Sequence, residues 1–317
     1  LLRFLAGLFI GGEYTAANPL AMEYAPKEKR GLYGAMIHTG YPAALLAITA
    51  LTAIMLQIAP ANGPASDYAR WGWRIPFLIG VILSAERFYY YWRRVPESDV
   101  WEAARQNREP HSPLRQLFHG SNLRLLVRLF IVMTGAWLTL NATIGALPGL
   151  ANVLGVSGST INTGTLIAAA GGVIVFPLLG MLSQRWGRRP TIILIGLLNA
   201  VPSGILYYLM VRGAQASPAA LTAYVAVVCW LSLLIWAVHT PYLVEHFRTE
   251  IRSAGYGISY SAATIIPGFY SFYMLGLSRF LPYEYTPIVL LVLGGIFLAI
   301  GAWTGPETKD VDLQTAG

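Results

Sequence analysis

Nine apolar stretches, each long enough to cross a lipid bilayer, constrain this chain more than any other feature of its sequence. A hydrocarbon core about 30 Å thick is spanned by about 20 helical residues. Since a backbone in contact with lipid must satisfy its own hydrogen bonds, each stretch is predicted to be an α-helix. Only 12% of the residues are charged, whereas soluble domains carry about 25%. We therefore expect an all-α membrane protein with stretches at residues 1–24, 31–59, 74–95, 123–150, 160–183, 190–212, 218–245, 254–277 and 283–304.

The Lys and Arg residues predict how these helices are oriented. Sixteen of them lie in one set of alternate loops and the C-terminal tail, and four lie in the other set. Positively charged loops stay on the cytoplasmic side, so the richer set and the C-terminus are predicted to be cytoplasmic. The same rule explains the net charge of +7. No basic face with interleaved aromatic residues appears, so we expect a lipid bilayer and no nucleic acid as partner. The expected location is the cell (plasma or inner) membrane.

Two short motifs each occur twice, at nearly the same separation. Pro-Glu-Ser and Pro-Glu-Thr close two stretches at Pro96 and Pro306, which lie 210 positions apart. A Glu followed seven positions later by an Arg occurs at Glu23–Arg30 and at Glu245–Arg252, and these copies lie 222 positions apart. The common period predicts two duplicated helical halves around a central path, which is a transporter architecture. A repeat of this length would begin about 110 residues before Leu1. We therefore expect the first half to be truncated to three helices.

The longest connection predicts the domain boundaries. Residues 96–122 are polar and include Pro110 and Pro113, as a linker between helical domains does. We expect the second half of an N-terminal bundle at 1–95, a cytoplasmic linker at 96–122, a six-helix bundle at 123–304 and a cytoplasmic tail at 305–317.

Polar residues inside the apolar stretches are candidates for a proton or substrate site. A carboxylate within a span is costly unless it faces a cavity or a partner, so Glu13 either carries a proton or anchors a hydrogen bond. Arg3 either holds an anion or extends to the outer surface. The others either line a path or pack between helices: Asn141, His239, Tyr242, Tyr256 and Tyr260. Tyr256, Tyr260 and Thr264 share one helix face. A lone His38 is a further possible proton relay.

Charged residues near the predicted cytoplasmic ends form a second candidate set. We expect these to form an inner-face charge latch that breaks when the two halves rock; the alternative is that the charges only set topology. The predicted latch comprises Glu23, Arg30, Gly180, Arg185, Gly187, Arg188, Arg189, Glu245 and Arg252.

The loop from Gly180 to Arg189 resembles the Gly-x-x-x-Asp-Arg-x-Gly-Arg-Arg loop of the major facilitator superfamily, with Gln184 in place of the Asp. The Arg-x-x-x-Gly-x-x-x-Gly pattern at residues 3–11 is similar to that superfamily's fourth-helix motif. Gly12-Glu13 and the segments 24–31 and 71–77 resemble its metabolite:proton symporter family, and the Pro-Glu motifs are shared with sugar porters. The resemblance implies the major facilitator fold, with two pseudo-symmetric six-helix bundles of which this chain would hold the fourth to twelfth helices.

The expected function is proton-coupled transport of a small organic acid or zwitterionic metabolite by alternating access, because the resemblance implies such substrates. Its partners would be the small-molecule substrate and protons, and we expect a monomer without cofactor or metal. Alternatives are a sugar porter, or a truncated membrane fragment that does not transport. An enzyme is disfavoured because the five histidines form no His-x-x-x-His pair and no Gly-x-Ser-x-Gly motif is present.

Overall fold

The computed structural model describes residues 2–60, 63, 65–94 and 113–313, without the side chains of residues 2–4 and 6. All of its regular structure is helical. The predicted linker lies mostly outside the described residues, as do Pro96 and the rest of the first Pro-Glu motif. The match between the ends of the two predicted repeats therefore stays a prediction.

Before the linker lie α1 (Leu2–Tyr24), η1 (Lys27–Lys29), α2 (Arg30–Ile58), η2 (Tyr68–Gly72) and α3 (Arg74–Arg94). After it lie α5 (Pro113–Leu117), α6 (Gly120–Leu140), η3 (Asn141–Gly145), α7 (Leu147–Leu154), α8 (Gly158–Trp186), α9 (Arg188–Leu198), η4 (Asn199–Ser203), α10 (Gly204–Arg212), α11 (Pro218–Leu233), η5 (Leu234–Ala237), α12 (His239–Val244), α13 (Thr249–Ser261), η6 (Ala262–Thr264), α14 (Ile265–Gly268), α15 (Tyr270–Leu277), η7 (Tyr283–Tyr285) and α16 (Thr286–Trp303).

Six helical segments among the described residues are long and apolar enough to cross a membrane. They are Lys27–Ile58, Gly120–Leu154, Gly158–Trp186, Arg188–Arg212, Pro218–Val244 and Tyr283–Trp303. Two of the remaining three predicted stretches are the helices α1 and α3, of 23 and 21 residues. The expectation of an uninterrupted helix at 254–277 is wrong, because this stretch is broken into α13, α14 and α15. Pro267, which lacks a backbone N–H and crowds the preceding turn, lies at the break.

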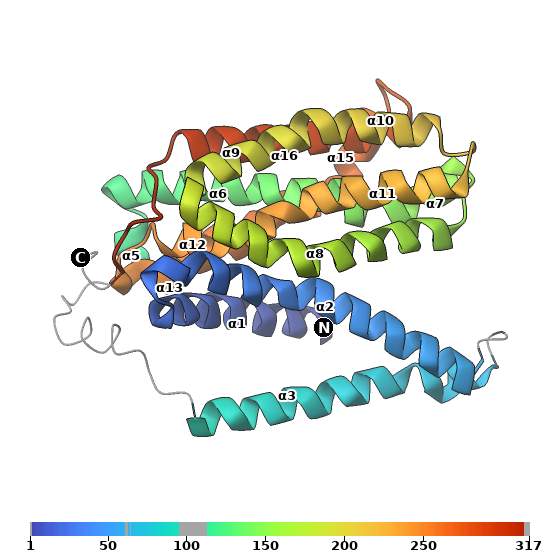
Figure 1. The fold of residues 1–317 in the computed structure, drawn as a ribbon, viewed down its shortest axis with the longest axis horizontal. Coiled ribbons are helices and arrows are strands. Elements are labelled where there is room, and N and C mark those ends of the chain that lie inside the picture. The colour runs from blue at the N-terminus through green and yellow to red at the C-terminus, as the bar shows by residue number, and fades with distance from the viewer. Residues whose placement is uncertain (1, 61–62, 64, 95–112, 314–317) are drawn as a thin grey trace.

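The chain forms one packed bundle with a separate arm (Figure 1). The segments from α6 to α16 pack against one another, and α1 and α2 lie against α13 and α8. α3 stands apart and is joined to the rest through α2, and Pro76 is its only buried residue. The buried apolar core accordingly lies mostly within α6–α16.

The helix α2 follows α8 over only part of its length. Its buried residues run from Arg30 to Pro42, and after that Met55 alone is buried. Figure 1 shows the C-terminal half of α2 diverging from α8 toward α3. The chain thus has two parts, α1–α3 before the predicted linker and α5–α16 after it. These two parts meet tightly at the end of the bundle that holds the start of α2, and they separate toward the other end.

Candidate functional site

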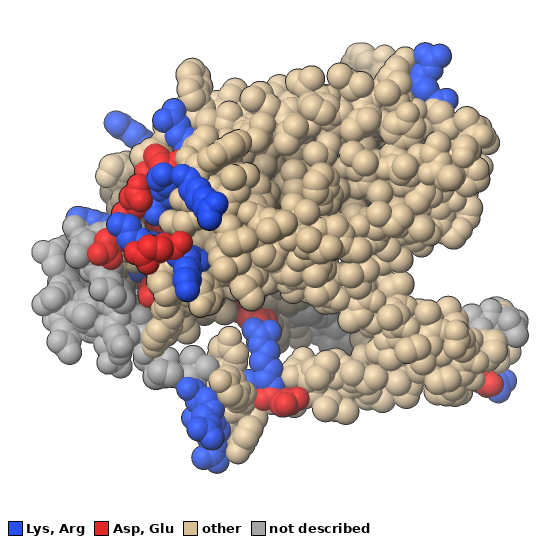
Figure 2. Space-filling model, in the orientation of Figure 1, with Lys and Arg blue, Asp and Glu red and all other residues tan. Residues whose placement is uncertain are grey.

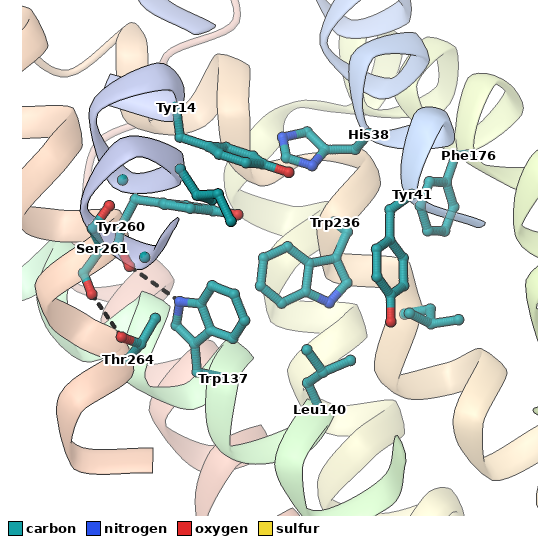
Figure 3. A pocket seen from close by; sticks show the side chains of 14 residues that line it. Tyr14, His38, Tyr41, Trp137, Leu140, Phe176, Trp236, Tyr260, Ser261 and Thr264 are labelled. Carbon is teal, nitrogen blue, oxygen red and sulfur yellow. Dashed lines mark hydrogen bonds between the residues drawn. The ribbon is translucent and has the colours of Figure 1, made fainter. Parts of the chain in front are cut away.

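A cavity of about 540 Å³ lies where α1 and α2 meet the larger bundle. Aromatic side chains form most of its wall, as Figure 3 shows. None of the lining residues is Asp, Glu, Lys or Arg, among the side chains that the structure describes. The residues around it are Gly7, Ile10, Gly11, Tyr14, His38, Tyr41, Trp137, Leu140, Phe176, Leu233, Trp236, Tyr260, Ser261 and Thr264.

The aromatic rings contact one another across the boundary between the two parts. Tyr14 of α1 stacks on Tyr260 of α13, with ring centroids 5.2 Å apart. Trp137 of α6 meets Trp236 of η5 edge to face at 4.6 Å, and its indole N–H donates to the Tyr260 carbonyl at 3.1 Å. Such pairs add about 0.5–1.5 kcal/mol each beyond the area that they bury. The wall is thus fixed in shape by contacts among its own rings.

A buried polar network lies beside this wall. The Asn18 side-chain amide donates to the Tyr256 hydroxyl at 2.7 Å, and Tyr256 lies 3.2 Å from the Thr240 hydroxyl. Nε2 of His38 lies 2.7 Å from the same Thr240 oxygen, and Nε2 of His239 lies 3.2 Å from it. All five side chains are buried. The network joins α1 and α2 to α12 and α13, so it links the two parts of the chain.

Only some predicted site residues lie at the cavity or in this network. Tyr260 lines the cavity, while Tyr256 and His239 belong to the network. The side chain of Arg3 lies outside the described residues, although its backbone is part of α1. Sequence reasoning missed Asn18, Tyr14, Trp137, Trp236 and Thr240, because such residues are common in helix packing and nothing in their spacing distinguishes them.

Asn141 and Tyr242 do not line this cavity, and their part in a substrate or proton path stays a prediction. The Asn141 amide donates to the Trp137 carbonyl one turn earlier, at 2.9 Å, where η3 begins. Tyr242 is buried away from the cavity, with its ring 4.5 Å from that of His246.

Glu13 lies in a different hollow, between α1 and α3. Its carboxylate is 2.6 Å from the Arg87 guanidinium, and both side chains are about half exposed. This hollow is also lined by Ser84, Phe88 and Tyr91 of α3. Figure 2 shows charged side chains in the gap between the arm and the bundle. Glu13 and the central cavity are therefore on different faces of α1, and its role in proton coupling stays a prediction.

Most of the charged side chains in Figure 2 gather at one end of the molecule, where the predicted latch residues lie. The two copies of the Glu and Arg motif are paired crosswise there. Arg252 of the second copy donates to Glu23 of the first at 2.6 Å, and Arg30 of the first lies 3.9 Å from Glu245 of the second. All four side chains are nearly inaccessible. Two repeats related by an approximate twofold axis would produce this crosswise pairing.

Arg188 is the centre of the latch. Its guanidinium binds both carboxylate oxygens of Glu245, at 3.1 and 3.2 Å, and also donates to Ser183 and Gln184. Burial raises the pKa of the Glu245 carboxyl, and the neighbouring Arg188 guanidinium acts in the opposite direction. Thr308 of the C-terminal segment donates to the same carboxylate at 2.9 Å.

Residues that were not predicted complete the latch. Gln184, in place of the resembled Asp, accepts from the Gly31 backbone N–H at 3.1 Å and from Arg188 at 2.5 Å. The Glu307 carboxylate accepts from the backbone N–H groups of Arg188 and Arg189, at 2.8 and 3.0 Å, and so caps α9. The family motif placed Gln184 at the position of the Asp, but an amide carries no charge and was therefore not among the predicted latch residues.

The predicted latch residues Arg185 and Arg189 make weaker contributions. The Arg185 side chain is exposed, and only its carbonyl takes part, accepting from Lys309 at 3.0 Å. Arg189 donates to the Trp303 carbonyl at the end of α16, at 2.8 Å. Arg185 therefore makes no ion pair with another described residue, and its membership of the latch stays a prediction.

Two predicted glycines have steric roles. Gly31 and Gly180 bring the backbones of α2 and α8 into contact, because a Cβ on Gly31 would lie 2.3 Å from the Gly180 carbonyl oxygen. Gly187 has a φ of 118°, a conformation that favours glycine, and forms the turn between α8 and α9. The latch thus combines ion pairs with close backbone contact.

Comparison with known proteins gives consistent matches. The profile of the Major Facilitator Superfamily matches residues 1–144 and 129–316. The shikimate transporter of Escherichia coli (strain K12) is 26% identical over an alignment of 325 positions, which covers 98% of this chain and 69% of that protein. The citrate-proton symporter of Klebsiella pneumoniae is 28% identical over an alignment of 273 positions, which covers 84% of this chain and 58% of that protein.

The same fold occurs in a solved structure. The proton:xylose symporter XylE bound to 6-bromo-6-deoxy-D-glucose aligns with a TM-score of 0.68, covering 93% of this chain and 68% of that chain at 22% identity. The resemblance predicted from the sequence motifs is confirmed by these matches. The matched family and relatives are transporters rather than enzymes.

Proposed function

This chain belongs to the major facilitator superfamily, and from that premise we propose that it carries a small organic acid or zwitterion across the cell membrane together with protons. The names of the two relatives, a shikimate transporter and a citrate-proton symporter, support this substrate class and the coupling to protons. The two-bundle arrangement, with residues 1–95 in one bundle and 123–304 in the other, is part of the proposal.

The observation that carries the proposal is a cavity at the boundary of two parts that are joined at one end. Alternating access requires such a site, with contacts on either side that form and break in turn. The latch joins α1 and α2 to α8, α12 and α13 at one end, while α2 diverges from α8 toward the other. The cavity volume of about 540 Å³ lies within the range of small-molecule sites.

One of the wall residues also holds a buried polar group without a partner. The indole N–H of Trp236, one of the lining residues, has no hydrogen-bond partner among the described residues. A buried donor without a partner costs about 1–3 kcal/mol. The aromatic rings of the wall would cover an apolar or ring-shaped body of a substrate.

Transport by the reconstituted chain tests the proposal. Proteoliposomes with an inside-alkaline pH gradient would be given radiolabelled shikimate, citrate, proline or xylose. We expect concentrative uptake of an acid or of proline that collapses when the gradient is dissipated. Uptake of xylose alone would favour the sugar porter, for which the stacking surfaces of Trp137 and Trp236 are the supporting observation. No uptake of any probe would contradict transport by this chain.

Replacing Glu13 with Gln tests the carboxylate on α1. The substitution keeps the volume of the side chain but removes its charge, so it weakens the 2.6 Å contact with Arg87. If Glu13 couples protons, uphill uptake should be lost while exchange of substrate is kept. Uphill uptake at the wild-type rate and pH profile would leave Glu13 as a partner that holds α3 near α1.

Cysteine labelling tests the orientation, which rests on the distribution of Lys and Arg. In a Cys229→Ala background, Ala216→Cys between α10 and α11 should react with an impermeant thiol reagent added outside. Glu250→Cys at the start of α13 should react only after the membrane is opened. Both positions are exposed on the protein surface. The reverse pattern of labelling would show that the C-terminus is outside.

A further inference from the structure

His38 and His239 face each other across the boundary between the two parts of the chain. His38 lies on α2 and His239 on α12, and their ring centroids are 4.2 Å apart in an edge-to-face arrangement. His38 lines the cavity, and both side chains are buried, with exposed fractions of 5% and 0%. We propose that this histidine pair is the proton-binding site of the cavity, with Nδ1 of His38 as the atom that takes up the proton. The inference rests on the proposed function.

The hydrogen bonds around Thr240 assign the neutral tautomers. Nδ1 of His239 lies 3.2 Å from the Trp236 carbonyl, so it carries the hydrogen and leaves Nε2 as an acceptor. The Thr240 hydroxyl has one hydrogen, which it donates to this Nε2. Tyr256 already accepts from Asn18, so its own hydroxyl donates to Thr240.

His38 must then donate from Nε2 to Thr240, at 2.7 Å, and its Nδ1 is left as a free acceptor. Protonation at Nδ1 adds a hydrogen to a lone pair and disturbs no bond of the network. Protonation of His239 at Nε2 would instead displace the hydrogen that Thr240 donates. The network therefore selects His38 over His239.

The pair takes one proton and not two. Two imidazolium rings with centroids 4.2 Å apart would repel each other strongly in a buried site. The other titratable groups near the pair, on the elements packed around it, are uncharged when they hold their protons: Tyr14, Tyr41, Cys229, Tyr256 and Tyr260. One bound proton thus makes the described cavity wall singly positive.

Among the side chains that the structure describes at the cavity, this single charge fits a substrate with one carboxylate. A monocarboxylate would be neutralised by the protonated His38, and the aromatic wall would cover its ring or apolar body. A tricarboxylate would bring two uncompensated charges into the site. When the two parts move apart, His38 separates from His239 and Thr240, so release of the proton is linked to opening of the boundary.

Tryptophan fluorescence tests the proton site without transport. The ring of Trp236 lies 6.4 Å from His38 and 5.1 Å from His239, so a charge on the pair should alter its emission. We expect a one-proton change as the pH is lowered, both in the purified protein and in the His239→Gln variant. The change should be lost in His38→Gln and kept in His119→Gln, an exposed histidine outside the cavity. Its persistence in His38→Gln, or its loss in His239→Gln, would overturn the assignment.

Transport of shikimate, a ring-bearing monocarboxylate, is the second test of the proton site. In proteoliposomes with the membrane potential held at zero, the shikimate accumulation ratio of His38→Gln should fall to about 1, because the coupling to protons is lost. Wild-type accumulation in His38→Gln would refute the proton site and leave the proposed function intact. Concentrative uptake of citrate but not of shikimate by the wild type would refute the monocarboxylate class. If no probe is transported, the proposed function fails, and the fluorescence titration alone decides on the proton site.

Discussion

Replacing Arg188 with Met should destabilise the latch by about 3–5 kcal/mol, because it leaves the Glu245 carboxylate buried without its main partner. Arg188 binds both oxygens of that carboxylate and is itself inaccessible. Arg30, at 3.9 Å, is too distant to replace it. The expected lowering of the Tm in detergent is on the order of 10 °C.

The same loop provides the control for this experiment. Arg185→Met makes the same chemical change three positions earlier, where the side chain is exposed, and should alter stability by less than about 0.5 kcal/mol. The double variant Arg188→Met with Glu245→Met should recover part of the loss, since it removes both buried charges. Equal melting of Arg188→Met and wild type would show that the ion pair does not hold this end together.

Adding one methyl group at Gly31 should prevent α2 and α8 from closing on each other. In Gly31→Ala the new Cβ would lie 2.3 Å from the Gly180 carbonyl oxygen and 2.6 Å from the Arg188 guanidinium. The opposing group is backbone, which cannot turn away as a side chain does, so the helices must separate. We expect a cost of about 1–3 kcal/mol and a loss of concentrative uptake.

The distance between the helices can be measured directly. In a Cys229→Ala background, spin labels at the exposed positions Tyr33 on α2 and Met181 on α8 should report a longer separation in Gly31→Ala. Gly40→Ala is the matched control on the same helix, because a Cβ there meets no atom within 4 Å. An unchanged distance in Gly31→Ala would mean that the glycine contact does not set the closure of this end.

The sequence alone determined the class of this protein, because the signals for it are local. Apolar stretches and their Lys and Arg flanks indicate helices in a bilayer without reference to any partner. The loop from Gly180 to Arg189 carried the family resemblance, which the profile match confirmed. Acidic and basic residues near the same membrane face also predicted that Glu23 and Arg252 would belong to one cluster, since a buried charged side chain needs a partner.

Only the tertiary structure decided which side chains meet. His38 and Thr240 lie 202 positions apart, and Asn18 and Tyr256 lie 238 positions apart. Whether such residues touch depends on the rotation and crossing of their helices, which hydropathy does not encode. Glu13 shows the same limit: its place in an apolar stretch indicated a buried partner, yet the rotation of α1 turns it toward Arg87 on α3 and away from the cavity. The polarity of a residue is local, whereas its neighbour is set by the packing of the whole bundle.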